Sequence, residues 1–204
     1  MRRRRRVALI VATENEGKRR EIALALALAG TDTDVRGLDA IGNQTPVAET
    51  GATFAENARI KARAWSSRTD ALVLADDSGL EVDALHGDPG VRSARYGGPE
   101  LNDEGRMNLV LERLTGIPED ERTARFRCVL ALARDGKILE TFEGVVEGKI
   151  TTEPRGTNGF GYDPIFFHPP SGCTTAELTT EEKQRISHRG QALARLVAAL
   201  DRYA

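Results

Sequence analysis

The apolar run Leu72–Ala75 is followed at once by two neighbouring aspartates, Asp76 and Asp77, and then by Ser78-Gly79. A short apolar run with turn residues directly behind it predicts a buried strand. In α/β proteins, ligands bind at the edge of the sheet where such strands end. We therefore expect an α/β fold in which the two carboxylates lie at a strand end, close to a ligand.

The two aspartates are expected to have different roles, because adjacent strand residues point to opposite faces unless the chain bends. Ser78-Gly79 would permit a bend. Crowded carboxylates repel each other, so one takes a proton or both share a cation. Mg²⁺ is the usual cation because it is hard and prefers oxygen ligands. The alternative is a solvated junction between strand and turn, since Asp and Ser are ordinary turn residues.

The remaining pattern predicts strands that alternate with helices and then an antiparallel pair. We expect strands at 7–12, 34–38, 72–75, 80–84, 125–133, 138–150 and 164–167, and helices at 16–29, 53–67, 102–114, 181–188 and 189–203. A hairpin turn at 134–137 joins the two long strands. This order indicates an α/β fold with a central mixed sheet flanked by helices.

The chain of 204 residues carries a net charge of −2, which argues against a general nucleic-acid binder. Arg2–Arg6 is interpreted as a disordered tail over residues 1–6, followed by a single domain over residues 7–204. The apolar run Val7–Ala12 is too short for a membrane span. The two cysteines, Cys128 and Cys173, form no disulfide framework or zinc motif. We expect a cytoplasmic protein with no membrane partner and no stable nucleic-acid partner.

The segment Thr13–Lys18 lies between the first predicted strand and the first predicted helix. A strand-to-helix turn presents backbone N–H groups and the positive end of the helix dipole to an anion. Lys18 adds a point charge suited to phosphate. The alternative is a helix N-cap by Thr13 or Asn15, with Lys18 on the solvent face.

Glu49 is a possible further metal ligand, just before the second predicted helix. Asn57 and Lys61 share one face of that helix because they are four residues apart. A solvated helix face explains Asn57 and Lys61 equally well.

The glycine-rich loop 156–164 contains Phe160, Tyr162 and Asp163. The two aromatic rings could form a stacking slot for a flat base, and Asp163 could either accept hydrogen bonds from a ring or hold the loop. The alternative for Phe160 is core packing. Further along the chain, Lys183 and Ser187-His188-Arg189 offer donors for phosphate or carbonyl oxygens. A helix cap or a structural hydrogen bond would also explain His188.

Six short motifs occur in order along the chain: Thr13-x-Asn15-x-x-Lys18, Glu49-Thr50-Gly51-x-Thr53-Phe54-x-Glu56-Asn57-Ala58, Ala75-Asp76-Asp77-Ser78-Gly79-Leu80, Ser93-Ala94-Arg95-Tyr96, Gly159-Phe160-Gly161-Tyr162-Asp163-Pro164 and Ser187-His188-Arg189. Together they resemble the inosine triphosphate pyrophosphatase family, which are hydrolases for deaminated purine nucleotides. The resemblance covers Val7 to about Leu200.

The resemblance implies Mg²⁺-dependent cleavage of ITP, dITP and XTP to the monophosphate and pyrophosphate. It also implies a homodimer and an elongated α/β fold with two lobes around a central cleft. The nearest alternative is a related pyrophosphatase for pyrimidine or modified nucleotides, which usually opens with Ser-x-Ser-x-x-Arg. A nucleotide- or RNA-binding module that uses Arg2–Arg6 is an alternative of another class.

Carried over by motif, the resemblance assigns a role to each matching residue. Asp77 would be the catalytic carboxylate and a magnesium ligand, with Glu49 and Asp76 close by. The triphosphate would be held by Thr13, Glu14, Asn15, Glu16, Gly17 and Lys18, together with Lys183. The nucleotide and its base would be contacted by Ser78, Phe160, Gly161, Tyr162, Asp163, His188 and Arg189.

Two consequences follow for substrate recognition. Donors from His188 or Arg189 would favour the 6-oxo group of hypoxanthine over the 6-amino group of adenine, which would reject ATP. Glu14 departs from the family, where a small residue is common. Because its carboxylate would repel a triphosphate, we expect it to point away or to meet a cation.

Overall fold

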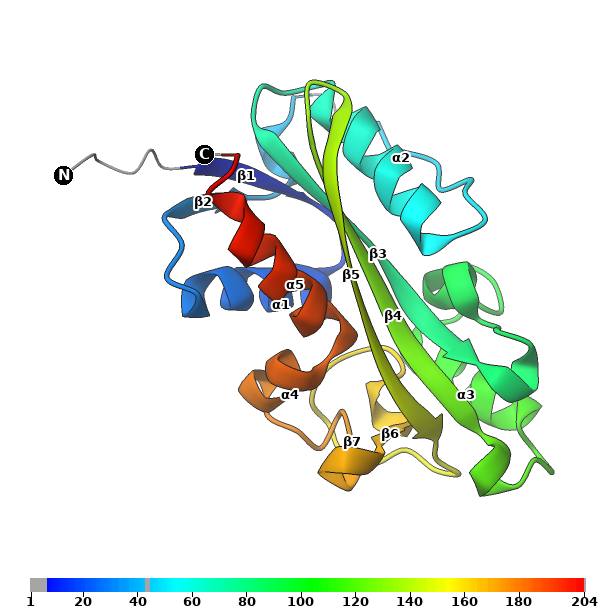
Figure 1. The fold of residues 1–204 in the computed structure, drawn as a ribbon. Coiled ribbons are helices and arrows are strands. Elements are labelled where there is room, and N and C mark those ends of the chain that lie inside the picture. Colours follow the sequence, from blue (N-terminus) through cyan, green and yellow to red (C-terminus); the bar gives the residue numbers. More distant parts are fainter. Residues whose placement is uncertain (1–6, 43–44, 204) are drawn as a thin grey trace. The chain divides into compact units, whose positions relative to one another are not determined.

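The computed structural model describes residues 7–42 and 45–203 (Figure 1). The predicted tail at residues 1–6 lies outside these described residues. The α/β prediction is confirmed, because seven strands form one sheet in the order β2-β1-β3-β4-β5-β6-β7. None of the helices in the described ranges combines the length and apolar character that crossing a membrane requires.

The strands are β1 (Val7–Ala12), β2 (Thr33–Arg36), β3 (Leu72–Val82), β4 (Thr123–Arg134), β5 (Lys137–Ile150), β6 (Phe166–His168) and β7 (Cys173–Thr174). The helices are α1 (Glu16–Leu28), α2 (Phe54–Ser66), α3 (Asp103–Arg113), α4 (Thr180–Ile186) and α5 (His188–Leu200). Most predicted elements are thus present, with ends shifted by a few residues.

The sheet is mixed, as predicted. β1 pairs in parallel with β2 and β3, and β6 pairs antiparallel with β5 and β7. The predicted hairpin turn between β4 and β5 is also confirmed. Asp135 and Gly136 have φ angles of 51° and 72°, and two successive positive φ values are typical of the type I′ turn that suits twisted hairpins.

The prediction that a strand ends at Ala75 is wrong. β3 continues through both aspartates and through Ser78-Gly79 to Val82, so it also absorbs the first residues of the strand predicted at 80–84. The strand predicted at 164–167 likewise begins later, at Phe166. Residues Asp163–Ile165 form a 3-10 turn instead, because Pro164 suits the start of a helical turn and lacks the N–H that a ladder needs.

The chain groups into two compact units, which we describe separately. The first contains the residues up to Asp77, Cys128–Gly144 and the residues from Arg189 onward. The second contains Ser78–Arg127 and Val145–His188. Strands β3, β4 and β5 each contribute residues to both units.

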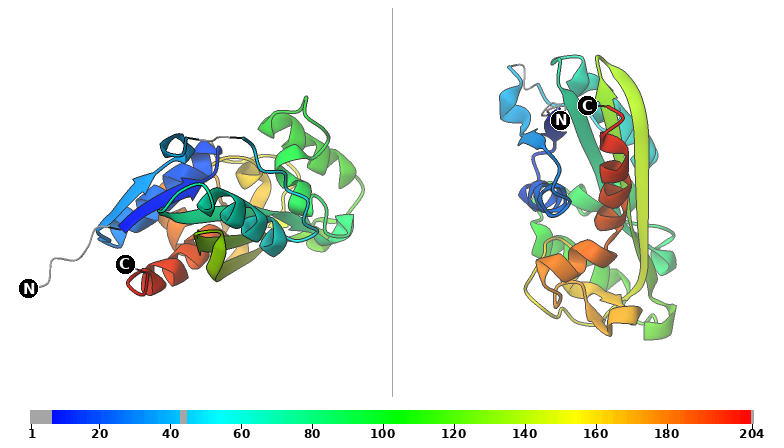
Figure 2. Two further views of the ribbon diagram at one scale, coloured as in Figure 1. Left: turned by 90° about the horizontal axis from the view of Figure 1, so that it is seen from above. Right: turned by 60° about the vertical axis from the view of Figure 1, so that its left-hand side comes forward.

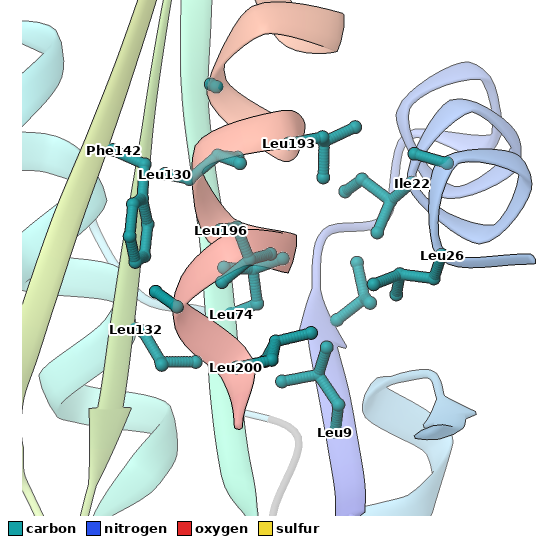
Figure 3. Close-up of a cluster of buried hydrophobic side chains, with 14 of the residues drawn as sticks. Leu9, Ile22, Leu26, Leu74, Leu130, Leu132, Phe142, Leu193, Leu196 and Leu200 are labelled. Atoms are coloured by element: carbon teal, nitrogen blue, oxygen red, sulfur yellow. The ribbon is translucent and has the colours of Figure 1, made fainter. Parts of the chain in front are cut away.

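The core of the first unit lies between its strands and the helices α1 and α5 (Figure 3). The strands contribute side chains two positions apart, such as Leu72 and Leu74, because alternate residues share one face. Helix α2 lies across the strands from α5 (Figures 1 and 2). Its buried Phe54, Ala58 and Trp65 therefore cover the opposite face of the sheet.

The core of the second unit joins the end of β3 to α3 and to the loop before β6. Its buried members include Leu80, Val82, Val110, Phe126 and Tyr162. The aromatic ring of Phe126 packs against that of Phe166, with centroids 4.4 Å apart. This core supports the glycine-rich loop that the sequence singles out.

Candidate functional site

Asp76 and Asp77 point to opposite faces of the sheet because β3 runs straight through them. The carboxylate of Asp76 pairs with Lys18 of α1 and with Arg189 of α5. The carboxylate of Asp77 pairs with Lys61 of α2, on the other face. The expectation that the two aspartates have different roles is therefore supported, and the alternative of a solvated junction is wrong.

The carboxylate of Asp76 is buried and saturated with donors. Lys18 Nζ lies 2.5 Å from Oδ1, and Arg189 Nε lies 2.8 Å from Oδ2. The thiol of Cys128 also donates to Oδ2 across 3.4 Å. Burial alone would raise the pKa of Asp76, but Arg189 and Lys18 outweigh it and hold that pKa well below its usual value of 3.8. Asp76 is thus a partner of protein cations in the described structure, and its expected role as a metal ligand stays a prediction.

Arg189 is one of the most buried side chains, with 2% of its surface exposed. Its guanidinium donates to Asp76 and to Glu21 of α1. Burial opposes its charge, yet the two carboxylates raise the pKa of Arg189 further. Two donors of Arg189 thus face carboxylates of the first unit, and its expected contact with the base edge stays a prediction.

Sequence reasoning missed Glu21, although one signal was present. Glu21 lies three residues after Lys18 on α1 and is only 7% exposed. A carboxylate beside Ile22, on the apolar side of a helix, needs a buried cation. Only the fold identifies that cation as Arg189.

Lys61 is the second residue that sequence reasoning did not place in the site. Its ammonium donates to Glu49 Oε1 at 2.7 Å, to the Asp76 carbonyl oxygen at 2.7 Å and to Asp77 Oδ1 at 3.1 Å. The Lys61 side chain is only 11% exposed, so the solvated-face alternative is wrong for it. Burial lowers the pKa of Lys61, but Asp77 and Glu49 raise it by more.

The carboxylate of Asp77 has fewer hydrogen-bond partners than the carboxylate of Asp76. Its Oδ2 atom is buried and has no hydrogen-bond partner in the part of the chain that the structure describes. Burial raises the pKa of Asp77 above its ordinary value, although Lys61 and Lys18 act against this. One carboxylate oxygen of Asp77 is thus available for a ligand or for a proton.

The loop that carries Glu49 is fastened to the start of α2. Asn57 is fully buried, and its Oδ1 accepts a hydrogen bond from Gly51 N at 2.8 Å. Thr53 and Glu56 form a capping box at the same helix end. This local structure explains the spacing of the second motif and fixes the direction from which Glu49 approaches Lys61.

The loop between β1 and α1 contains a helix cap, and its predicted phosphate-binding role stays a prediction. Asn15 caps α1, and its Oδ1 accepts from Lys18 N at 2.9 Å, whereas Glu16 and Gly17 open the helix. The N-cap alternative is therefore confirmed for Asn15, but Lys18 is not on a solvent face, because its side chain is 15% exposed and binds Asp76.

Whether Glu14 points away from the triphosphate or meets a cation stays a prediction. It lines a cavity of about 270 Å³ whose other lining residues include one cation, Arg19. The rest of the lining comes from Thr13, Leu38, Asp39 and Trp65.

In the second unit, Asp163 organises the glycine-rich loop. Its carboxylate accepts from Phe160 N at 2.8 Å, from Thr175 Oγ1 at 2.9 Å and from Lys183 Nζ at 2.5 Å. Gly159 has a φ of +77°, and a Cβ there would lie 2.1 Å from Asp163 Oδ2. Of the two predicted roles for Asp163, holding the loop is the one that the structure displays.

Lys183 belongs with the residues predicted to bind the base. It pairs with Asp163, and its ammonium lies 4.9 Å from the centre of the Phe160 ring. Its expected assignment to the triphosphate group stays a prediction.

The two aromatic residues of the loop differ in environment. Tyr162 is 6% exposed, belongs to the core, and donates its hydroxyl hydrogen to the Ser93 carbonyl oxygen at 2.9 Å. The predicted contact of Tyr162 with the base stays a prediction. Phe160 is partly exposed, so it remains the candidate for stacking. Between them, Gly161 N donates to Asp103 Oδ2 at 3.3 Å.

His188 and Ser78 also lie in the second unit. His188 is buried, and its ring stacks on Phe126 with centroids 4.8 Å apart and planes 15° apart. Ser78 lies partly buried within β3. Their contacts with a nucleotide stay predictions.

The donor set around Asp77 fits a magnesium ion. Across residues 7–42 and 45–203, no three His, Cys, Asp or Glu side chains converge as a preformed metal cluster. Mg²⁺, however, commonly takes only one or two carboxylates and completes its shell with water and substrate phosphates. The unpartnered Oδ2 of Asp77 and the nearby carboxylate of Glu49 meet that need, whereas Asp76 does not.

Comparisons with known proteins identify relatives of this chain. The Ham1 family model matches residues 9–199. The chain is 52% identical to a dITP/XTP pyrophosphatase of Bacillus licheniformis, over 95% of this chain and 97% of the relative. It is 48% identical to the dITP/XTP pyrophosphatase of Bacillus subtilis, over 94% and 96% of the two chains.

Solved structures give the same result. A HAM1 protein from Coxiella burnetii has a TM-score of 0.86 at 42% identity and covers 96% of this chain and 99% of its own. A nucleoside-triphosphatase, dITP/XTP pyrophosphatase, from Mycobacterium abscessus has a TM-score of 0.75 at 41% identity, over 93% and 98% of the two chains. With the family model spanning nearly the whole sequence, this chain belongs to the Ham1 family.

Proposed function

We propose that this protein hydrolyses the non-standard purine nucleotides ITP, dITP and XTP to the nucleoside monophosphate and pyrophosphate. Relatives that are about half identical over nearly the whole chain carry the name dITP/XTP pyrophosphatase. Their names do not favour the alternative of a pyrimidine or modified nucleotide. The structural observation that carries the proposal is Asp77, a buried carboxylate with one unpartnered oxygen beside Lys61 and Glu49.

In the proposed reaction, the oxygen of a water molecule attacks the α-phosphorus. The bond from that phosphorus to the oxygen bridging the α- and β-phosphates breaks, and pyrophosphate leaves with the bond's electron pair. We assign the water proton to Asp77 acting through a second water molecule, because a carboxylate that binds Mg²⁺ directly is a poor proton acceptor. Asp76 is a poor acceptor because Arg189 and Lys18 lower its pKa.

The negative charge of the triphosphate would be offset by two lysines of the first unit, Lys18 and Lys61. Both are positively charged side chains on helices that flank β3. Mg²⁺ would be held by Asp77 and Glu49, where it would neutralise phosphate oxygens and lower the pKa of a bound water. Such electrostatic stabilisation is the main contribution that proteins make to phosphoryl transfer.

The base would stack on Phe160, the partly exposed ring of the glycine-rich loop. The ammonium of Lys183 beside that ring adds positive charge where a 6-oxo group would benefit from a donor. His188 stays the predicted donor at the base edge. An amino group facing such donors would leave both partners unsatisfied, which is the physical basis for rejecting ATP.

We further propose that the protein acts as a homodimer in the cytoplasm, as the family resemblance implies. Size-exclusion chromatography with light scattering would measure the mass in solution. A monomer at micromolar concentration would contradict the proposed dimer without affecting the proposed reaction.

The test of the function is a substrate panel of ITP, XTP, dITP, GTP, ATP and TTP, assayed for pyrophosphate release with and without Mg²⁺. We expect rapid release from ITP, XTP and dITP, and only with Mg²⁺ present. A preference for TTP, or no release from any substrate, would overturn the proposal.

A further inference from the structure

Lys61 is surrounded by oxygen atoms in a way that is typical of a bound cation. An ammonium group has three N–H donors and no acceptor. The three donors of Lys61 meet three different oxygens, those of Glu49, the Asp76 carbonyl and Asp77, at 2.7, 2.7 and 3.1 Å. All three belong to the oxygen types that hard divalent cations prefer.

These contacts lie where solvent screening is weak. The side chain of Lys61 is 11% exposed and that of Asp77 is 8% exposed. Without a cation, the carboxylates of Glu49 and Asp77 would repel each other at this depth. The ammonium therefore holds the two carboxylates together.

We propose that Lys61 is the counter-cation of Glu49 and Asp77 in the nucleotide-free protein, and that it leaves these oxygens when a divalent cation binds. This inference rests on the proposed function, because it takes Mg²⁺ as the ion that Asp77 and Glu49 hold. An ammonium and a divalent cation repel each other and compete for the same carboxylates. The flexible four-carbon stem of Lys61 allows the ammonium to move to the phosphates that arrive with the metal.

The proposal makes the free protein a weak binder of divalent cations. Lys61 blocks the carboxylates until a nucleotide offers it new oxygen partners. Coupling of this kind is reciprocal, so the nucleotide strengthens metal binding by the same factor as the metal strengthens nucleotide binding. The competing possibility is that the metal binds the unpartnered Oδ2 of Asp77 and leaves Lys61 in place.

The first measurement is the affinity of the nucleotide-free protein for Mn²⁺, from the electron paramagnetic resonance signal of the unbound ion. Lys61→Met should bind Mn²⁺ at least tenfold more tightly than the wild type. Lys137→Met is the matched control, because it removes one positive charge from an exposed position, the first residue of β5. An affinity of Lys61→Met no higher than that of the control would overturn the proposal.

The second measurement follows the ammonium itself. The nitrogen-15 signal of the Lys61 ammonium, assigned by its absence in Lys61→Met, should be visible in the free protein and should shift or vanish at saturating Mg²⁺. A signal that stays unchanged would show that the metal binds without moving Lys61, and it would overturn the proposal.

The results of these experiments distinguish a failure of the proposed function from a failure of the inference about Lys61. If ITP hydrolysis needs Mg²⁺ but Lys61→Met binds Mn²⁺ no more tightly than the control, only the role of Lys61 is wrong. If ITP is hydrolysed without any divalent cation, the metal in the proposed function and the inference about Lys61 fail together.

Discussion

Two neighbouring aspartates in one strand have opposite electrostatic environments. Asp76 lies among Lys18, Arg189 and the Cys128 thiol, which stabilise its charge. Asp77 keeps one oxygen unpartnered in the described structure, and burial disfavours its charge. At the scale of single residues, Asp76 therefore organises the site and Asp77 carries the proposed chemistry.

We expect Asp77→Asn to lower kcat for ITP by at least about 100-fold, because the amide cannot accept the proton of the attacking water. The raised pKa of Asp77 means that its surroundings disfavour the charged form. Because the amide also removes a carboxylate partner of Lys61, a loss of stability must be measured separately from the loss of chemistry. Steady-state kinetics and thermal unfolding test this prediction, and retention of more than a tenth of the wild-type kcat would contradict it.

Asp76→Asn should instead destabilise the protein in a pH-dependent way. The pKa of Asp76 is depressed in the folded state, so its contribution is fully present above the unfolded value, about 3.9, and is lost as the pH falls through the folded pKa. Breaking a buried ion pair costs about 3–5 kcal/mol. Urea unfolding should show this deficit at pH 7 and a smaller one below about pH 4. A deficit that is constant over this range would argue against the ion-pair origin.

Arg189→Ala should reduce activity on ITP and on ATP by similar factors, because its guanidinium faces Glu21 and Asp76. We expect a loss of unfolding free energy of about 3–5 kcal/mol, since two buried carboxylates lose their cation. Arg202→Ala is the control, because Arg202 pairs with Glu140 at the surface and is 61% exposed. A much larger loss of activity on ITP than on ATP would instead indicate that Arg189 contacts the base edge.

At the scale of elements, β3 passes without a break from the first unit into the second. Just after Ser78-Gly79, the strand lies close to Ser93. The Ser93 hydroxyl accepts a hydrogen bond from Leu80 N at 2.9 Å and donates one to the Gly90 carbonyl oxygen at 2.7 Å. The motif at residues 75–80 and the motif at residues 93–96 thus meet at one structural contact.

Gly79→Ala should break this contact. Its added Cβ would lie 2.3 Å from Ser93 Oγ and 2.7 Å from the Gly90 carbonyl oxygen. We expect a loss of about 1–3 kcal/mol of unfolding free energy, the usual cost of overpacking. Gly42→Ala is the matched control, because no atom lies within 4 Å of its added Cβ. Equal urea midpoints for the two variants would contradict the prediction.

At the scale of the whole molecule, the two units carry different parts of the proposed recognition. Lys18, Lys61 and Asp77, the residues assigned to the phosphates and the metal, belong to the first unit. Phe160 and Asp163, which are assigned to the base loop, belong to the second. The predicted cleft between two lobes and the single domain over residues 7–204 stay predictions.

Substitutions in the two units should therefore affect different ligands. Phe160→Ala should weaken binding of inosine monophosphate by about 1–3 kcal/mol, the value of one base–aromatic stack, and should leave inhibition by pyrophosphate unchanged.

Lys18→Met should weaken inhibition by pyrophosphate, because it removes a phosphate partner. Competition kinetics with both ligands separates these effects, and a loss of pyrophosphate inhibition in Phe160→Ala would contradict the division.

Much of the fold was predictable from local patterns. The hairpin turn at Asp135-Gly136, the Asn15 cap and the capping box at Thr53 all depend on residues a few positions apart. The family could be recognised because six such motifs occur in order. The end of β3 was misjudged because Asp, Ser and Gly are turn residues in general, whereas here they lie within one continuous strand, and the Ser93 hydroxyl accepts from Leu80 N just after Gly79.

The sequence by itself determined the α/β class, the order of most elements and the family. Only the tertiary structure decided which acid is saturated, which lysine faces Asp77 and which aromatic ring is buried. The reason is that buried charges take their partners from distant segments: Glu21 and Arg189 lie 168 residues apart in the chain, and Lys61 and Asp77 lie on different elements. Burial makes such pairs strong, and the folded chain alone brings them together.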